Sequence, residues 1–340
     1  MGAAIKAIEY YLPREVLSNQ QLSSEFPEWT MDKIEEKTGI LERSIAAKEE
    51  CSSDLGIEAA RKLFASGACR SDEIDFLLLC TQSPDFFLPT TACLMQERLG
   101  IPRDAGALDF NLGCSGFIYG LGLAQGLIET GQAKNVLLIT AETYSKFMNP
   151  GDKSVRTIFG DAAAATLIRE LDSGQNPSLP NIGPFIYGTD GRGGDNLIVR
   201  NGGMRNPRSG CPATPDNQGN YRSDDNLYMN GSEIFAFTLR VVPNSVSSLL
   251  SRAGKRLEDI DLFVFHQANR YMLDHLRKKL NIPEEKFYIA LRHCGNTVSS
   301  TIPIALKEAL EEGKLKAGKI IMLVGFGVGY SWGATLIRWV

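Results

Sequence analysis

The chain contains an internal duplication, and this feature restricts its fold more than any other. Three pairs of segments match in the same order along the chain: 72–82 with 258–268, 126–140 with 309–324, and 165–169 with 334–338. The last pair is an identical pentapeptide, ATLIR. Because the offsets are all similar, chance does not explain three such matches. The sequence therefore predicts two copies of one structural unit.

Each copy has the pattern of an α/β unit, in which apolar runs of strand length alternate with amphipathic helical segments. The expected strands are 74–80, 135–141, 163–169, 261–266, 319–326 and 334–340. The expected helices are 54–66, 115–130, 232–252, 269–280 and 300–312. The continuous apolar runs indicate sheets covered on both faces. We expect one copy at 1–172, a loop-rich connection or insert at 173–225, and the second copy at 226–340.

Composition limits the possible function classes. The net charge of -4 provides no overall attraction to nucleic acid or to an anionic membrane. No apolar stretch is long enough for a membrane helix, and the N-terminus lacks a signal peptide, so we expect a cytoplasmic protein. The seven cysteines and three histidines lack metal-ligand spacing, so we expect neither a metal site nor a disulfide framework.

Three polar residues lie at related points of the two copies. Cys114 and Asn296 each follow a loop and precede an expected helix, and His266 ends an expected strand. Strand ends and helix starts meet in one crevice of such folds. The helix after Cys114 is expected to lower the pKa of the thiol. Each residue alone also fits a structural role, as a buried cysteine, a strand-end histidine or a turn asparagine. Their joint placement favours a catalytic site.

Ordered motifs across nearly the whole chain carry a family resemblance. They are EKTGILERSIAA (36–47), GCSGF (113–117), IFGDAAAA (158–165), HQAN (266–269), GNT (295–297) and GFGVGYSWGATLIRW (325–339). Together they resemble β-ketoacyl-ACP synthase III (3-oxoacyl-[acyl-carrier-protein] synthase III) of the thiolase superfamily. The resemblance implies an α/β thiolase-like fold, with two duplicated halves in an α-β-α-β-α layered arrangement.

The resemblance also implies a reaction that initiates fatty-acid synthesis. Cys114 would take an acyl group from acyl-CoA, and a decarboxylating Claisen condensation with malonyl-ACP would then give 3-oxoacyl-ACP. The backbone N–H groups of Cys114 and Val328 would form the oxyanion hole. His266 and Asn296 would donate hydrogen bonds to the enolate. No cofactor is needed, since acyl-CoA is a substrate.

Substrate contacts follow from the resemblance at Leu88, Lys33, Lys153, Asn269 and Phe326. Lys33 and Lys153 stand where the family often has a Trp and an Arg against the adenine of CoA. Leu88 stands where the family often has a Phe that shapes the acyl pocket. These departures leave both the acyl length and the choice between a CoA-bound and a carrier-bound donor open.

The resemblance implies a homodimer and an acidic acyl carrier protein as partner. Arg277, Lys278 and Lys279 are candidates for the basic patch that meets the carrier, although an ordinary solvated helix face has the same pattern. One alternative is a synthase III-like acyltransferase of secondary metabolism with a different donor or acceptor. Another is an inactive scaffold that binds carrier protein. The complete Cys/His/Asn set favours the condensing enzyme.

Overall fold

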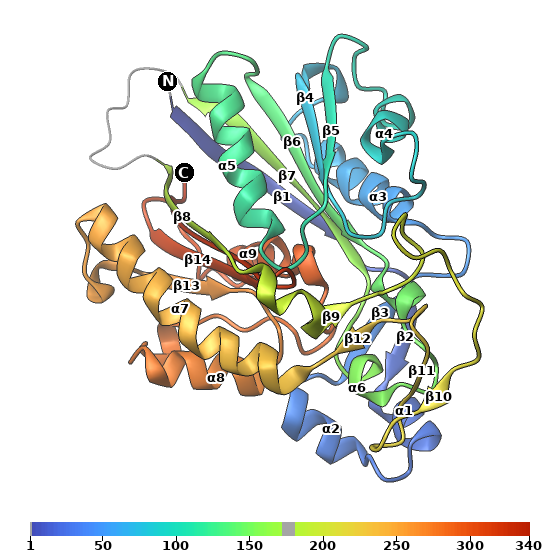
Figure 1. The fold of residues 1–340 in the computed structure, drawn as a ribbon. Coiled ribbons are helices and arrows are strands. Elements are labelled where there is room, and N and C mark those ends of the chain that lie inside the picture. The colour runs from blue at the N-terminus through green and yellow to red at the C-terminus, as the bar shows by residue number, and fades with distance from the viewer. Residues whose placement is uncertain (1, 172–180) are drawn as a thin grey trace.

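Two mixed β-sheets lie at the centre of the structure, one from each half of the chain (Figure 1). The computed structural model describes residues 2–171 and 181–340. Helices cover the outer face of each sheet and fill the space between the sheets. The resulting order of layers is helix, sheet, helix, sheet, helix, which confirms the α/β thiolase-like fold that the sequence predicts.

The N-terminal sheet has the strand order β1-β7-β6-β4-β5. Its strands are β1 (Gly2–Tyr11), β4 (Phe76–Cys80), β5 (Gly106–Phe110), β6 (Asn135–Glu142) and β7 (Ala162–Leu171). β4 runs parallel to β5 and β6, whereas β7 is antiparallel to its two neighbours. Its outer face packs against α3 (Ser52–Ala65) and α4 (Thr91–Leu99).

The C-terminal sheet has the strand order β13-β14-β15-β8. Its strands are β8 (Ile182–Thr189), β13 (Leu262–Phe265), β14 (Ile320–Gly327) and β15 (Ser331–Arg338). β13 and β14 are parallel, and the other two pairings are antiparallel. Its outer face carries α7 (Gly231–Ala253) and α8 (Arg270–Lys279) (Figure 1).

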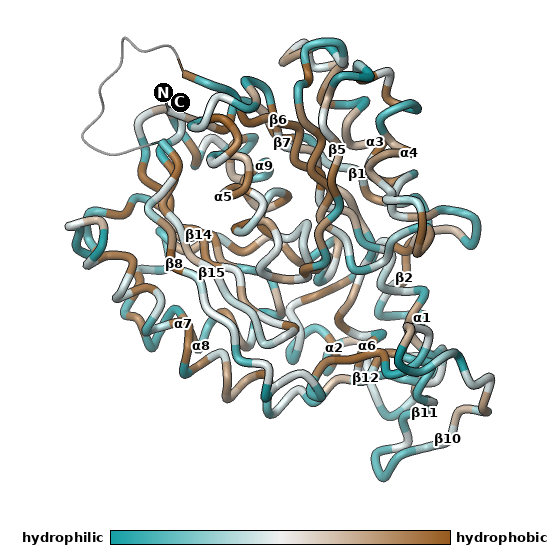
Figure 2. Tube along the Cα trace, turned by 45° about the horizontal axis from the view of Figure 1, so that its top comes forward, coloured by the Kyte–Doolittle hydropathy of each residue, from teal (hydrophilic) through white to brown (hydrophobic). Residues whose placement is uncertain are grey.

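The two sheets repeat one topology, which confirms the predicted duplication. β4, β6 and β7 correspond in order and direction to β13, β14 and β15, and the repeated pentapeptide lies in β7 and β15. The middle layer consists of α5 (Gly116–Glu129) and α9 (Thr301–Glu311), which pack between the sheets. Because both faces of each sheet are covered, the central strands are apolar along their length, as the brown traces of β6 and β7 show in Figure 2.

The C-terminal unit begins earlier than the sequence predicts. β8 lies inside the segment 173–225 that was expected to be a loop-rich connection, yet it pairs with β15 and takes the place that β1 has in the first sheet. Its glycines and Pro184 interrupt the apolar run that would reveal a strand. Residues 172–180 lie outside the described residues, so the predicted boundary at 172 stays a prediction.

The longest helix is amphipathic. α7 is long and apolar enough, by length and hydropathy alone, to cross a membrane. However, Phe237, Val242 and Leu249 on one of its faces are buried in the apolar core beneath it, whereas Glu233 and Arg240 are exposed. This pattern is typical of a helix that covers a sheet in a globular domain.

The smaller elements gather at one end of the two sheets (Figure 1). They are α1 (Asn19–Glu25), α2 (Met31–Thr38), α6 (Lys153–Arg156), β2 (Glu15–Ser18), β3 (Glu42–Ile45), β9 (Leu197–Ile198), β10 (Thr214–Pro215), β11 (Tyr221–Arg222) and β12 (Tyr228–Met229). β9 pairs with β12, and β10 forms a hairpin with β11. The connections at this end bring segments of both halves against the turn that contains Cys114.

Candidate active site

Cys114 lies in a tight turn between β5 and α5, and its side chain is buried. The N–H of Gly116 donates to the carbonyl of Gly113 at 2.7 Å, which closes the turn. A Cβ atom on Gly113 would lie 2.4 Å from Oε1 of Gln82 and 2.7 Å from Val328. A side chain at this position would have to displace Gln82 and Val328, so the turn packs closely against both halves of the molecule.

Backbone amides surround the sulfur of Cys114. The N–H groups of Val328 and of Cys114 itself donate hydrogen bonds to the thiol, and both lower its pKa. A Cβ atom on Gly327 would lie 2.6 Å from the sulfur, so the end of β14 packs directly on the side chain. Two N–H donors from separate segments therefore converge at the sulfur, an arrangement that can stabilise negative charge beside it.

The predicted lowering of the Cys114 pKa is wrong for the free protein. Burial, together with the nearby carboxyl of Glu142, raises the pKa of this thiol to about 12, against the two amide hydrogen bonds that lower it. The thiol therefore keeps its proton at neutral pH. A base would have to take that proton for the sulfur to act as a nucleophile.

His266 follows β13 directly and is buried. Its Nδ1 lies 2.8 Å from Oγ1 of Thr301, and its ring stands edge-on to Phe326 with 5.6 Å between the ring centres. Burial lowers its pKa to about 3, against a hydrogen bond with the backbone of Val298 that raises it, so the imidazole is neutral at neutral pH. Thr301 and Phe326 together fix the orientation of the ring.

Asn296 is held in the loop before α9 by both its backbone and its side chain. Its N–H donates to Ile158 at 2.9 Å, its carbonyl accepts from Gly160 at 3.0 Å, and its Oδ1 accepts from the N–H of Val298 at 2.9 Å. Within the described part of the chain, no hydrogen bond engages its amide nitrogen. That N–H₂ group is therefore available as a donor.

Val298 is the point at which the three polar residues meet. It belongs to the same apolar cluster as Cys114, its N–H binds Asn296, and its backbone also bonds to His266. It adopts φ 55, a left-handed conformation that is rare for a β-branched residue. Strain of this kind is typical of functional sites. Cys114, His266 and Asn296 thus lie around Val298, and their catalytic roles stay predictions.

An apolar cluster surrounds Cys114. Its buried members include Tyr144, Val155, Phe159, Leu197 and Leu227, and Phe147 and Met148 pack against them. The hydroxyl of Tyr144 donates to Oε1 of Gln82, which packs on the Cys114 turn. The side chains of β9 and β12 therefore belong to the site, although they lie in the stretch that the sequence predicts as loops.

Leu88 does not belong to this apolar cluster in the described structure. Its side chain is 85% exposed, in the loop that also presents Phe86 and Phe87 to solvent, and it lies outside the apolar cluster of Cys114. The contribution of Leu88 to the acyl pocket therefore stays a prediction.

Lys33 and Lys153 both contact Glu28, and so they do not form an open site against which an adenine could stack. Lys153 Nζ lies 2.7 Å from Oε1 of Glu28, and Lys33 Nζ donates to the Glu28 carbonyl at 2.9 Å. The hydrogen bond from Lys153 lowers the pKa of the Glu28 carboxyl. Lys33 also lies over the ring of Trp29, 5.1 Å from its centre. These two lysines are therefore neighbours, and Glu28 balances part of their charge.

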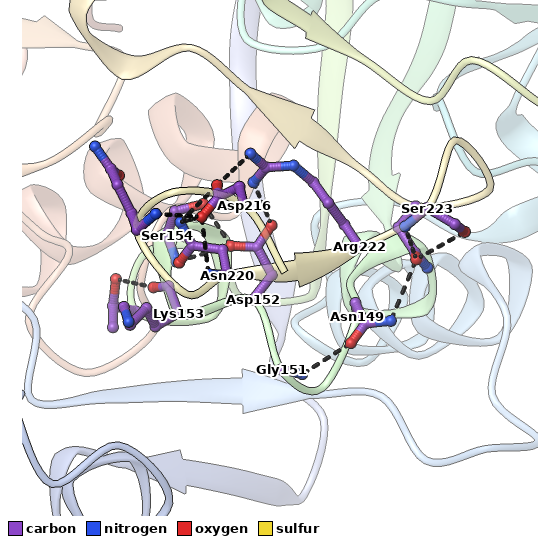
Figure 3. Close-up of polar contacts among 12 residues, drawn as sticks. Asn149, Gly151, Asp152, Lys153, Ser154, Asp216, Asn220, Arg222 and Ser223 are labelled. Atoms are coloured by element: carbon purple, nitrogen blue, oxygen red, sulfur yellow. Dashed lines mark hydrogen bonds and ion pairs between the residues drawn. The ribbon is translucent and has the colours of Figure 1, made fainter. Parts of the chain in front are cut away.

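The hairpin β10–β11 is fastened to the helix that carries Lys153. Figure 3 shows the guanidinium of Arg222 between the carboxylates of Asp152 and Asp216, at 3.0 and 2.6 Å. Asp152 is fully buried and caps α6 through the N–H of Ser154. The segment 199–225 is thus attached to α6 through ion pairs that the sequence does not single out.

The remaining predicted residues have structural contacts. Asn269 caps α8 by accepting from the N–H of Met272 at 2.8 Å, and Phe326 is buried against His266. Arg277 pairs with Glu284, and Lys279 donates to the carbonyl of Leu239. All seven cysteines are free.

The sequence does not single out several further residues at the site, although Arg43 lies within the motif at 36–47. Arg43 is fully buried and donates to the carbonyl of Thr157, next to the segment that holds Asn296. Thr301 and Glu142 bind residues of the site from α9 and β6. A clue for Glu142 is that a charged side chain in an otherwise apolar strand needs a specific partner.

Comparison with known proteins agrees with this geometry. Family models for 3-oxoacyl-[acyl-carrier-protein (ACP)] synthase III match residues 108–191, which contain Cys114, and the model of its C-terminal part matches residues 250–339, which contain His266 and Asn296. A β-ketoacyl-[acyl-carrier-protein] synthase III from Clostridium perfringens is 39% identical over 329 residues, which cover 96% of each chain.

Solved structures match the whole chain as well. A crystal structure of 3-oxoacyl-(acyl-carrier-protein) synthase III is 55% identical and covers 100% of both chains, with a TM-score of 0.97. A 3-oxoacyl-(acyl-carrier protein) synthase from Burkholderia xenovorans LB400 is 35% identical, covers 100% of this chain and 94% of its own, and has a TM-score of 0.89. Matches of this extent, over both halves of the duplicated fold, show that the chain belongs to the 3-oxoacyl-[acyl-carrier-protein] synthase III family of condensing enzymes.

Proposed function

We propose that this chain initiates fatty-acid synthesis by joining an acyl group to malonyl-ACP, through an acyl-enzyme on Cys114. The observation that carries the proposal is the pair of backbone N–H groups, from Val328 and Cys114, that donate to the Cys114 sulfur. Removing one such donor typically slows acyl transfer by about 100- to 1000-fold. The neutral imidazole of His266 and the amide donor of Asn296 both contact Val298, which packs in the same cluster as Cys114.

In the first stage, the sulfur of Cys114 attacks the carbonyl carbon of an acyl thioester. His266 accepts the thiol proton, which supplies the base that the raised Cys114 pKa requires. The tetrahedral oxyanion is held by the N–H groups of Val328 and Cys114. The bond to the donor sulfur then breaks, and the donor thiolate takes the proton back from His266.

In the second stage, malonyl-ACP loses carbon dioxide, and the electron pair of the broken bond forms an enolate. The Nδ2 of Asn296 and the Nε2 of His266 donate hydrogen bonds to its oxygen. The α-carbon of the enolate attacks the acyl carbonyl of Cys114, the bond to the Cys114 sulfur breaks, and 3-oxoacyl-ACP leaves. Solvent returns one proton to the thiolate. No metal or organic cofactor takes part.

His266 must accept a proton in one stage and donate one in the other, and Thr301 suits both. The Thr301 hydroxyl lies 2.8 Å from His266 Nδ1 and 3.0 Å from the carbonyl of Val298. When it donates to Val298, Nδ1 carries the imidazole proton and Nε2 is an acceptor. When it donates to Nδ1, Nε2 carries the proton and is a donor.

The acyl donor is proposed to be acyl-CoA, with Lys33, Lys153, Asn269 and Phe326 at or beneath its binding path. The lysine pair suits phosphate groups, although Glu28 offsets part of its charge. Asn269 uses its Oδ1 to cap α8, which leaves its amide nitrogen for substrate. Phe326 acts through the His266 ring on which it packs.

Two partners complete the proposal. The carrier protein would dock on Arg277, Lys278 and Lys279, of which Lys278 has no ion pair within the described chain. A homodimer would cover the exposed Phe86, Phe87 and Leu88 and the edge strand β5, on which Leu108 is 43% exposed. We place the enzyme in the cytoplasm, where its substrates are made. A monomer in sedimentation at micromolar concentration would contradict the dimer.

An acyltransferase of secondary metabolism with another acceptor is the second candidate, favoured by the Lys33–Glu28–Lys153 arrangement at the entrance. It shares the first stage and differs in the second. An inactive scaffold that binds carrier protein is the third, and it predicts no adduct on Cys114. The complete set of Cys114, His266 and Asn296 around Val298 argues against an inactive scaffold.

Intact-protein mass spectrometry distinguishes these functions. The protein is incubated with a panel of acyl-CoAs, and malonyl-ACP is then added. We expect an acyl adduct that is absent from Cys114→Ala but present in Cys69→Ala, which removes another buried thiol. Discharge of the adduct into 3-oxoacyl-ACP supports the condensing enzyme, whereas an adduct that malonyl-ACP leaves in place indicates another acceptor. No adduct from any acyl-CoA or acyl-ACP would overturn the acyl-enzyme.

A further inference from the structure

Glu142, the last residue of β6, is a fully buried carboxyl in the described structure. Its Oε1 accepts from the hydroxyl of Ser299 at 2.7 Å, and its Oε2 accepts from the N–H of Gln82 at 3.0 Å. None of the ion pairs among residues 2–171 and 181–340 includes Glu142. Burying a carboxyl without a nearby cation lowers the stability of the fold. The presence of Glu142 here therefore indicates a role other than stabilising the fold.

One oxygen of Glu142 holds the segment that supports the nucleophile. Gln82 follows β4 in the N-terminal half, and its side-chain oxygen packs on Gly113, where a Cβ atom would lie 2.4 Å away. Ser83 also donates to Oε2 of Glu142 at 3.4 Å, and it accepts from the N–H of Thr143. A shift of Glu142 would therefore move the surface on which the Cys114 turn rests.

The other oxygen of Glu142 holds the segment that supports the imidazole and the amide. Ser299 lies in the C-terminal half between Val298, whose N–H binds Asn296, and Thr301, whose hydroxyl meets His266. The side chain of Ser299 thus ties both of these partners to a residue of the N-terminal half. A single carboxyl bridges the two halves directly beneath the site.

The protonation state of Glu142 suits the chemistry. Burial raises its pKa to about 8, against hydrogen bonds from Ser299, Gln82 and Ser83 that lower it. The titratable groups that face it are Cys80 at the end of β4, Cys114 before α5, Tyr144 after β6 and Asp161 before β7. None of these supplies a positive charge, so the carboxyl is neutral at neutral pH.

We propose that Glu142 is a positioning residue that joins the Cys114 turn to the Asn296–Thr301 segment, and that it does so as a neutral carboxylic acid. This inference rests on the proposed function for its effect on turnover, but not for its effect on the thiol. Ionisation of Glu142 would place a negative charge beside the nascent thiolate and raise the pKa of Cys114. The same residue therefore aligns the site and limits the alkaline range in which it works.

The conservative variant Glu142→Gln separates these roles, since glutamine is neutral at every pH and keeps an oxygen acceptor. The matched control is Glu308→Gln on α9. The pKa of that carboxyl is raised to about 7 by burial and by Glu312, and it lies two helical turns beyond Thr301. Both variants make the same chemical change to a carboxyl that titrates near neutral pH.

The first readout is alkylation of Cys114 by iodoacetamide across pH, followed by peptide mass spectrometry, because it requires no substrate of the proposed reaction. We expect Glu142→Gln to alkylate severalfold faster than the wild-type protein at about pH 9, with no difference at about pH 6. Glu308→Gln should follow the wild type. Identical profiles for Glu142→Gln and wild type would overturn the proposed neutral acid.

The second readout is the rate of acyl-enzyme formation. Wild-type acylation should level off or fall above about pH 8, whereas Glu142→Gln should continue to rise and stay within about threefold of wild type near neutral pH. Glu142→Ala, which removes the bridge, should lose both acylation and discharge. Equal loss in Glu142→Gln and Glu142→Ala would overturn the inference. If wild type forms no acyl-enzyme, the proposed function fails and the alkylation profiles still decide the state of Glu142.

Discussion

Nδ1 of His266 lies 2.8 Å from the hydroxyl oxygen of Thr301, a residue of α9 rather than of the strand that leads to the histidine. The same hydroxyl lies 3.0 Å from the carbonyl of Val298. The hydroxyl proton of Thr301 can therefore be donated either to Nδ1 of His266 or to the carbonyl oxygen of Val298. The position of this proton decides whether Nε2 of His266 accepts or donates.

Substitution Thr301→Val tests this control of the tautomer. Without the hydroxyl, the backbone of Val298 is the remaining partner of Nδ1, so the proton stays on Nδ1 and Nε2 stays an acceptor. Acylation should change by less than about threefold, while discharge by malonyl-ACP should slow about 100-fold, as for the loss of one oxyanion donor. Single-turnover mass spectrometry measures both steps.

The control is Thr301→Ser, which keeps the hydroxyl and should retain both rates. Equal slowing of acylation and discharge in Thr301→Val would show that the hydroxyl only supports the fold. Thermal unfolding of both variants separates that case from a specific effect.

Substitution Asn296→Asp tests the amide donor without removing its support. Oδ1 still accepts from the N–H of Val298, which preserves the loop, but the N–H₂ donor becomes a carboxylate oxygen. Acylation should persist, and decarboxylation should slow by about 100- to 1000-fold. The release of carbon dioxide from labelled malonyl-ACP measures this step. Unchanged carbon dioxide release would remove Asn296 from the reaction.

Much of the fold follows from local patterns in the sequence. The repeated segments place β7 opposite β15 in the two sheets, and all five expected helices form as α3, α5, α7, α8 and α9. β8 escapes prediction because Gly183 and Pro184 interrupt its apolar pattern, and its identity as a strand comes from pairing with β15. Tertiary pairing of this kind has no local signal.

The candidate site likewise contains residues with a local sequence signal and residues without one. Cys114 and Asn296 are visible because each stands in a glycine-flanked turn before a helix. The raised Cys114 pKa is not visible, since it depends on how completely other segments bury the sulfur. Residues such as Thr301 and Tyr144 act only through three-dimensional neighbours. Motif and spacing identify reacting groups, whereas packing sets their protonation.

The depth of the acyl pocket should depend on Tyr144. Its ring packs on Phe147 and Phe159 within the apolar cluster around Cys114, and its hydroxyl is held by Gln82. Substitution Tyr144→Leu removes ring volume and the anchored hydroxyl. We expect the variant to form acyl-enzyme with longer acyl-CoAs than the wild type accepts, with acetyl transfer largely retained. An unchanged chain-length limit would place the acyl group elsewhere.

Recognition of CoA should improve when Glu28 is neutralised. Glu28 holds Lys153 at 2.7 Å, so part of the lysine charge is unavailable to phosphates. Substitution Glu28→Gln should lower KM for acyl-CoA about threefold, an effect that salt should weaken. The matched substrate is an acyl-pantetheine thioester, which lacks the nucleotide and should show the same KM in both proteins. A raised KM for acyl-CoA would mean that Glu28 orders the lysines for binding.

Two buried groups give the folding stability opposite pH dependences. His266 has a pKa of about 3 when folded against 6.5 for the ordinary side chain, so its unfolded form gains a proton first, and stability falls as pH falls below 6.5. Glu142 has a pKa of about 8 when folded against 4.5, so its unfolded form loses a proton first, and stability falls as pH rises from 4.5 to 8. Each slope reaches about 1.4 kcal/mol per pH unit.

Substitution Glu142→Gln should therefore stabilise the protein in a pH-dependent way. Near pH 4.5 the variant and the wild type should unfold at similar denaturant concentrations, and the variant should gain progressively up to about pH 8, because its side chain has no proton to lose. Urea unfolding at one fixed protein concentration measures the difference, since a dimer would make stability depend on concentration. A difference that does not vary with pH would show that Glu142 is ionised in the folded protein. In that case the variant would be more stable only if its side chain keeps the hydrogen bonds to Ser299 and Gln82. The alkylation rate of Cys114 reports independently whether these hydrogen bonds survive.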